Sequence, residues 1–154
     1  MSSTFTQLYA HIIFAVRGKK ASISQTYEAE IYEFISTVAD KLGHNILIIN
    51  GTSDHIHLLV KLNPSQPVSD LVREIKKQSS FYINHKILKK HGFNWEGGYS
   101  AFTQPRNQVN ALFKYIEKQK EYHHDINFRE EYLTLQEQKE NEPVDEMIFK
   151  YRNQ

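Results

Sequence analysis

The stretch Thr52-Ser-Asp-His-Ile-His-Leu-Leu-Val60 carries the pattern that decides the fold of this 154-residue chain. In an extended strand, side chains two residues apart point to the same side, so His55 and His57 share one face. The other face carries an unbroken apolar row, made of Ile56, Leu58 and Val60. The pattern predicts a strand that buries its apolar row in a core and carries two imidazoles on its opposite face.

Two aligned imidazoles can form half of a metal site, because neutral imidazole nitrogen is a common protein ligand for divalent cations. A His-x-His pair is also frequent in strands as surface or hydrogen-bonded histidine. The pair alone therefore leaves both interpretations open, and further ligands must come from elsewhere in the sequence.

The composition indicates one compact cytoplasmic domain, residues 1–154, with 40% hydrophobic residues for its core. The chain has no cysteine, which excludes disulfides, thiolate zinc sites and cysteine nucleophiles and fits a reducing compartment. No apolar run approaches the ~20 residues of a membrane helix, so we expect no membrane association. The net charge is only +1, so any affinity for DNA must come from a local basic patch.

The order of the predicted elements indicates an α+β fold. Strands are predicted at 5–17, 44–50, 54–62 and 97–103, and helices at about 24–42, 69–90 (with Ser69 as its N-cap), 105–123 and 128–140. The order β-α-β-β-α-β with additional C-terminal helices is ferredoxin-like, an antiparallel sheet with helices on one face and the histidine strand at a central position. The C-terminal helix and tail occupy about 126–154, where Met147-Ile-Phe149 is expected to dock as an edge element.

A second motif, Tyr115-Ile-Glu-Lys-Gln119, lies in the predicted helix 105–123. Residues four apart share one helical face, so Tyr115 and Gln119 lie together. A phenol is a poor nucleophile until something stabilises its negative charge, and a nearby metal ion can assist by polarising a phosphate. An amide oxygen from Gln119 is a hard ligand suited to Mg²⁺ or Mn²⁺. The alternative is a tyrosine at the edge of the core and a solvated glutamine.

The two motifs together resemble the single-tyrosine HUH transposases, found in insertion sequences and among the REP-associated tyrosine transposases. The resemblance covers most of the chain, and its further matching segments are Leu8-Tyr-Ala-His-Ile-Ile-Phe14, Trp95-Glu-Gly-Gly-Tyr99, His123-His124 and Phe128-Arg-Glu-Glu131. One departure is Arg17-Gly-Lys-Lys20, which stands where the resemblance leads us to expect a different set of basic residues.

The resemblance implies a metal-dependent transposase that cleaves and rejoins single-stranded DNA and recognises hairpins near element ends. His55, His57 and Gln119 would hold Mg²⁺ or Mn²⁺, and Tyr115 would attack the scissile phosphate to give a 5′-phosphotyrosine link. The family usually forms homodimers, and in many members the tyrosine acts in trans on the partner's histidines. The resemblance implies DNA contacts on the second helix and at Arg17. The helix residues are Arg73, Lys76 and Lys77, with Gln78, Ser79 and Ser80 alongside to bond phosphates. The alternative for this helix is a solvated face.

Several side chains have two interpretations. Tyr122 lies on nearly the same helix face as Tyr115, but it lacks a glutamine four residues later, so Tyr115 is the favoured nucleophile. His123 and His124 could extend the metal site, although their place near a helix end favours an interaction with the helix dipole. Asp54 points to the opposite face of its strand, so a supporting role fits it better than direct ligation. His11 is expected to be a strand-core histidine that could also support the site.

Other functions remain as alternatives. A domesticated binder of single-stranded or hairpin DNA would keep the fold and the basic surface but lose a histidine or the tyrosine, and none is lost here. Another HUH-type nicking enzyme, such as a replication initiator or relaxase, generally carries accessory domains for which 154 residues leave no room. A ferredoxin-like RNA binder would need exposed aromatic residues on the sheet face where the histidines stand.

Overall fold

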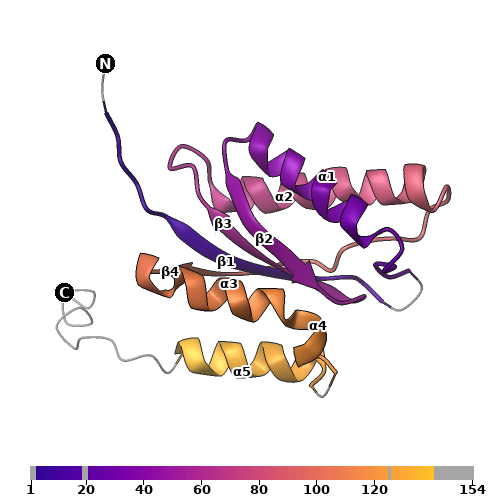
Figure 1. Ribbon diagram of the computed structural model, residues 1–154. Coiled ribbons are helices and arrows are strands. Elements are labelled where there is room, and N and C mark those ends of the chain that lie inside the picture. Colours follow the sequence, from indigo (N-terminus) through magenta and orange to yellow (C-terminus); the bar gives the residue numbers. More distant parts are fainter. Residues whose placement is uncertain (1–2, 19–20, 125, 141–154) are drawn as a thin grey trace, which may run out of the picture.

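The computed structural model describes residues 3–18, 21–124 and 126–140. Its centre is a four-stranded antiparallel sheet in the order β2-β3-β1-β4 (Figure 1). The strands are β1 (Tyr9–Ala15), β2 (Asn45–Gly51), β3 (His55–Lys61) and β4 (Ser100–Gln104). This is the predicted ferredoxin-like α+β arrangement. The strand with the histidines, β3, pairs with β1 on one side and β2 on the other, which confirms its central position.

Helices α1 (Glu28–Lys41) and α2 (Val68–Tyr82) cover one face of the sheet (Figure 1). The apolar row of β3 is fully buried there, with Ile56, Leu58 and Val60 all at 0% exposure. Ile35 of α1 and Ile75 of α2 belong to the same cluster. The alternating pattern of the sequence therefore placed the main core on the correct side of β3.

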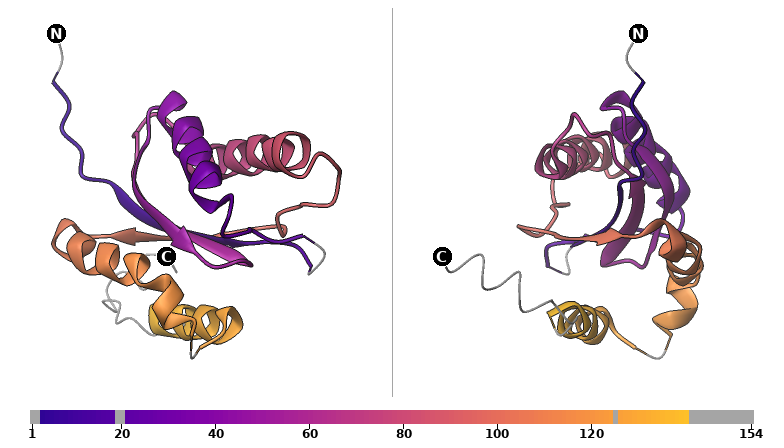
Figure 2. Two further views of the ribbon diagram at one scale, coloured as in Figure 1. Left: turned by 45° about the vertical axis from the view of Figure 1, so that its right-hand side comes forward. Right: turned by 90° about the vertical axis from the view of Figure 1, so that its left-hand side faces the viewer.

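The histidine face is covered by the C-terminal helices α3 (Val109–Glu117), α4 (Gln119–Tyr122) and α5 (Phe128–Glu140), which lie on the far side of the sheet from α1 and α2 (Figures 1 and 2). A second, smaller apolar cluster lies on this face and consists of Tyr9, Leu59, Val109 and Ile116. The prediction of helices on one face is thus correct for α1 and α2 only, because the added helices bury the other face.

Several element boundaries differ from the prediction: β1 is shorter than the predicted strand 5–17, α1 begins at Glu28 rather than about 24, and two later helices differ in kind. The helix predicted from Ser69 begins at Val68 without a side-chain cap, and after Tyr82 it continues as a π-helix, Ile83–Ile87. The helix predicted over 105–123 consists of a 3₁₀ turn, Arg106–Gln108, followed by α3 and α4.

The break between α3 and α4 has a physical cause that lies on β2. The side-chain amide of Asn50 donates hydrogen bonds to the carbonyl oxygens of Ile116 and Glu117, each at 3.0 Å. These contacts satisfy the last carbonyls of α3 and end it at Lys118. No pattern within 105–123 reveals a partner 66 residues earlier in the chain.

Two further predictions have different outcomes. The expected edge element Met147-Ile-Phe149 lies outside the described residues, as does the rest of 141–154. Across the part of the chain that is described, no helix combines the length and the apolar content needed to cross a membrane.

Candidate metal and nucleophile site

His55 and His57 point from β3 into the layer beneath the C-terminal helices, and both are completely buried. The ring of His57 is hydrogen-bonded through Nδ1 to His11 Nε2 on β1, at 2.8 Å. The ring of His55 donates from Nδ1 to the Asp54 carboxylate at 2.8 Å, and Thr52 donates its hydroxyl to the same carboxylate oxygen. These outer contacts fix the orientation of both rings. His11 is buried in its strand, as expected.

Gln119 and Tyr115 reach the same place from α4 and α3. The amide oxygen of Gln119 lies 3.1 Å from His55 Nε2, and its amide nitrogen donates to Glu131 Oε2 at 2.8 Å. The Tyr115 hydroxyl donates a hydrogen bond to the same Glu131 oxygen. The structure therefore brings together the four residues that the two motifs singled out, even though the helix breaks between Tyr115 and Gln119.

Sequence reasoning gave no role to Glu131, which is the common partner of the site. Its carboxylate is 1% exposed. Its Oε1 atom lies 3.0 Å from His57 Nε2, 2.9 Å from His123 Nε2 and 3.5 Å from His55 Nε2. One feature of the sequence did point to Glu131. Phe128, Tyr132 and Leu135 fall at helical spacing and form the less exposed side of α5, and Glu131 is a charged residue on that same side.

His123 belongs to this cluster, whereas the sequence favoured a role at the helix end. Its Nδ1 atom donates to the carbonyl oxygen of Ile126 at 2.6 Å, which turns Nε2 towards Glu131. The ring of His55 lies against His123 on one side and stacks on Phe128 on another, with centroids 4.5 Å and 4.1 Å away. The turn between α4 and α5 thus folds the C-terminal helix back over the histidines.

The cluster fits a divalent cation. His55, His57, His123 and Glu131 each offer one ligand atom, and these atoms all lie within 4.8 Å of one another. Neighbouring ligands bound at 2.0–2.1 Å around one octahedral ion would lie about 3.0 Å apart. The Glu131 oxygen lies 2.9–3.5 Å from the three imidazole nitrogens, so small shifts bring these donors onto a single ion.

The protonation states are set by burial and by the carboxylate. Burial opposes ionisation of Glu131, but its contacts with the imidazoles of His55 and His57 outweigh it and hold the Glu131 pKa far below its usual range. Burial, and then the adjacent Glu131 carboxylate, raise the pKa of Tyr115 well above its usual value. Burial lowers the pKa of His11 to about 3, so this imidazole is neutral at pH 7. Tyr115 needs additional positive charge nearby before it becomes a good nucleophile.

The rival tyrosine lies close to this arrangement. The rings of Tyr122 and Tyr115 have centroids 5.5 Å apart. Among the described contacts of Glu131, the phenol bonded to the carboxylate is that of Tyr115. The two phenols therefore differ in their contact with the buried carboxylate.

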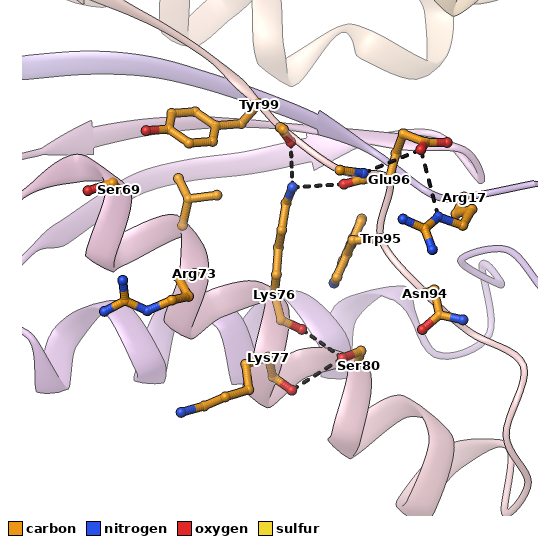
Figure 3. Close-up of a pocket in the computed structure, with 13 residues that line it drawn as sticks. Arg17, Ser69, Arg73, Lys76, Lys77, Ser80, Asn94, Trp95, Glu96 and Tyr99 are labelled. Atoms are coloured by element: carbon orange, nitrogen blue, oxygen red, sulfur yellow. Dashed lines mark hydrogen bonds and ion pairs between the residues drawn. The ribbon is translucent and has the colours of Figure 1, made fainter.

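The basic residues of the second helix lie beyond the other face of the sheet. Arg17, Arg73, Lys76 and Lys77 line an open pocket of about 530 Å³ between α2 and residues 94–99 (Figure 3). Arg73 and Lys77 point away from the loop, with the Arg73 guanidinium 2.9 Å from Asp70 and the Lys77 amine 3.1 Å from Glu74.

Two of the expected DNA contacts have structural partners instead. Lys76 donates to the backbone carbonyls of Glu96, at 2.8 Å, and Gly98, which holds the loop against α2 (Figure 3). Ser79 is buried and accepts a hydrogen bond from the Trp95 indole at 2.8 Å. The structure therefore does not place Ser79 on this surface. Ser79 lies on the buried side of α2. The serine that lines the pocket is Ser80.

A ferredoxin-like sheet that carries a His-x-His pair opposite a tyrosine helix is the architecture of an HUH-type transposase. Residues 4–119 match the family described as "Transposase IS200 like", and the chain belongs to this family. The ISDra2 transposase TnpA of Deinococcus radiodurans is 25% identical over 118 residues, which cover 73% of this chain and 84% of that protein.

Two solved structures share the fold. A transposase from Deinococcus radiodurans R1 superposes with a TM-score of 0.59 at 18% identity, covering 77% of this chain and 96% of its own. A REP-associated tyrosine transposase bound to a REP hairpin superposes with a TM-score of 0.61 at 17% identity, covering 82% of this chain and 76% of its own.

Proposed function

We propose that this transposase cleaves and rejoins single-stranded DNA with Tyr115 as the nucleophile. The observation that carries the proposal is the convergence of the Tyr115 hydroxyl, the Gln119 amide and the histidines of β3 on one buried carboxylate. In the reaction, the phenolic oxygen bonds to phosphorus, the bond to the 3′-oxygen breaks, and that oxygen leaves as a 3′-hydroxyl with the proton given up by the phenol. Attack by another 3′-hydroxyl on the 5′-phosphotyrosine rejoins the strands without ATP.

His55, His57 and Gln119 would hold the Mg²⁺ or Mn²⁺ ion that the family resemblance implies. When bound, the ion supplies positive charge beside the scissile phosphate, which stabilises the charge that develops in the transition state. The contacts of Asp54 and His11 support this role, because they turn both Nε2 atoms towards the carboxylate and the glutamine.

The pocket beside α2 is the proposed contact surface for the DNA backbone. Arg17, Arg73 and Lys77 supply the charge, and the Ser80 hydroxyl is a further hydrogen-bonding group. Residues 96–99 line both this pocket and a hollow beside α5, so a strand held in the pocket would have a continuous path towards the histidine face. The relative solved with a REP hairpin supports hairpin DNA as the ligand. Such phosphate contacts position the DNA and do not read its sequence.

Two alternatives make different predictions. A domesticated DNA-binding protein would bind the hairpin but form no covalent adduct. An HUH-type nicking enzyme would form the adduct but would not transfer the strand to a second 3′-hydroxyl. The intact set of His55, His57, Tyr115 and Gln119 favours the transposase over the first alternative.

A covalent-adduct assay tests the nucleophile. The full chain is incubated with Mg²⁺ and a single-stranded oligonucleotide taken from its own genomic flanks, and the products are separated on a denaturing gel. We expect Tyr115→Phe to abolish the adduct and Tyr122→Phe to retain it, because only the Tyr115 hydroxyl is bonded to Glu131 among the described contacts. An undiminished adduct from Tyr115→Phe would contradict the proposal. Loss of the adduct in His57→Ala with DNA binding retained would separate catalysis from recognition.

The proposed DNA surface is tested through its salt dependence. Arg73→Ala and Lys77→Ala should each weaken hairpin binding and reduce the slope of log K against log salt by about 1, since each removes one phosphate contact. Fluorescence anisotropy over a salt series measures this slope. Lys61→Ala is the matched control, because Lys61 is an exposed lysine at the end of β3, away from the pocket. Unchanged slopes in both α2 variants would place the DNA elsewhere.

A further inference from the structure

We propose that Glu131 and His123 are ligands of the same metal ion as His55 and His57, so that the C-terminal helix closes the metal site. The inference rests on the metal dependence in the proposed function. It adds two ligands from outside residues 4–119, the part of the chain that matches the family.

The first step concerns the protons of the imidazoles. His55 Nδ1 lies 2.8 Å from the Asp54 carboxylate, and His123 Nδ1 lies 2.6 Å from the Ile126 carbonyl oxygen. Both partners are acceptors, so each Nδ1 carries its proton. In the neutral rings, the Nε2 atoms of His55 and His123 therefore carry lone pairs.

The second step concerns what these lone pairs face. The Nε2 atoms of His123 and His55 lie 2.9 Å and 3.5 Å from Glu131 Oε1, which is also an acceptor. Gln119 donates its amide nitrogen to Glu131 Oε2, so its amide oxygen faces His55 Nε2 at 3.1 Å. When the rings are neutral, these acceptor atoms face one another in a buried space, an arrangement that is costly unless a positive charge lies among them. A divalent cation satisfies all of these atoms together.

The third step concerns the remaining histidine and the nucleophile. His57 Nε2 lies 3.0 Å from the same Glu131 oxygen, and a proton on its Nδ1 can be donated to His11 Nε2. The second oxygen of Glu131 stays with the Tyr115 hydroxyl and the Gln119 amide. One carboxylate therefore joins the ion to the nucleophile. Three imidazoles and a carboxylate also favour Mn²⁺ over Mg²⁺, because imidazole is a better ligand for transition metals.

The test measures metal binding without DNA. Titration calorimetry with Mn²⁺ gives the affinity of the full chain, and pulsed EPR on the bound Mn²⁺ counts the coordinated imidazoles. We expect three imidazoles in the wild type and two in His123→Asn, and we expect Glu131→Gln to weaken Mn²⁺ binding at least tenfold. Glu137→Gln and His124→Asn are the matched controls, because both residues are exposed and neither belongs to the proposed ligand set. Neither control should change the affinity or the spectrum.

The outcomes separate this inference from the proposed function. Two imidazoles in the wild-type spectrum, or an unchanged affinity in folded Glu131→Gln, would overturn the inference, while adduct formation by Tyr115 would still stand. Three imidazoles with no adduct would support the inference and contradict the proposed chemistry. If Glu131→Gln fails to fold, the imidazole count in the wild type decides the question by itself, since His55 and His57 alone can supply only two.

Discussion

At the scale of single residues, His44 shows how burial without full hydrogen bonding makes stability depend on pH. Its Nδ1 accepts a hydrogen bond from the backbone amide of Asn63 at 3.0 Å. Its Nε2 is buried and has no hydrogen-bond partner among the described residues. Burial lowers the pKa of His44 below 6.5, so the folded protein resists its protonation. Protonation of Nδ1 would also end the bond from Asn63.

This environment predicts a loss of stability in mild acid. Because the folded-state pKa of His44 is depressed, its contribution is fully present above about 6.5. As the pH falls below that value, the unfolded chain binds the proton first and the free energy of unfolding decreases. Urea unfolding at pH 7.5 and 5.5 measures the change. His44→Gln keeps an acceptor for Asn63 and should show a smaller decrease than the wild type. An equal decrease in both proteins would contradict this account.

Some residues of the site could be predicted from the spacing within one strand or helix, and others could not. His55 and His57 follow from a period of two within β3, and Tyr115 and Gln119 from a spacing of four. Ser79 was misplaced because the basic side of α2 and its buried side adjoin at that position, and only the contact with Trp95 shows which side it faces.

At the scale of elements, the β2–β3 hairpin holds the histidines through a close backbone approach at Gly51. A Cβ atom added to Gly51 would lie 2.1 Å from the carbonyl oxygen of His55 and 2.8 Å from the Cα of Ile56. These are backbone atoms of the strand that carries the site, so they can move only if β3 moves. Glycine is therefore required here by space.

We expect Gly51→Ala to destabilise the protein by about 1–3 kcal/mol, the usual cost of forcing extra atoms into a packed region. It should also weaken Mn²⁺ binding, since the displaced residue is His55. Urea unfolding and calorimetry measure the two effects. Gly97→Ala is the matched control, because an added Cβ there meets nothing within 4 Å. Equal stability of the two variants would show that β3 adapts without cost.

Element types followed from periodicity, but contacts between elements did not. The strands and the helices were each expected from their apolar spacing, but the position of α3–α5 on the second face of the sheet was not. The break at Lys118 depends on Asn50, and the position of Glu131 depends on the turn that folds α5 back over the sheet. Both are contacts between residues far apart in the sequence, and the hydrophobic pattern within one element carries no information about them.

At the scale of the whole molecule, the two faces of the sheet have different tasks. The face beneath α1 and α2 is the main core, and the face beneath α3–α5 holds the polar cluster. The histidines of β3 and the tyrosine of α3 already meet within one chain, through Glu131. This geometry supports a tyrosine that acts in cis, whether or not the protein forms the expected homodimer.

Mixing two inactive variants tests that arrangement. Tyr115→Phe keeps the histidines, and His57→Ala keeps the tyrosine. If the tyrosine acts in cis, no subunit in the mixture has both halves, and the mixture should form no adduct. If it acts in trans, subunit exchange in a two-fold dimer restores about a quarter of the wild-type sites.

The comparison requires that subunits exchange, so the two variants are co-expressed with different tags and isolated as the doubly tagged species. Light scattering on the wild type establishes whether a dimer exists. A doubly tagged dimer without adduct supports cis action, because the single chain then has to supply Tyr115 and His57 together. Adduct formation on the His57→Ala subunit would show instead that its tyrosine reaches the histidines of the Tyr115→Phe subunit, and that Tyr115 leaves Glu131 of its own chain when the dimer engages DNA.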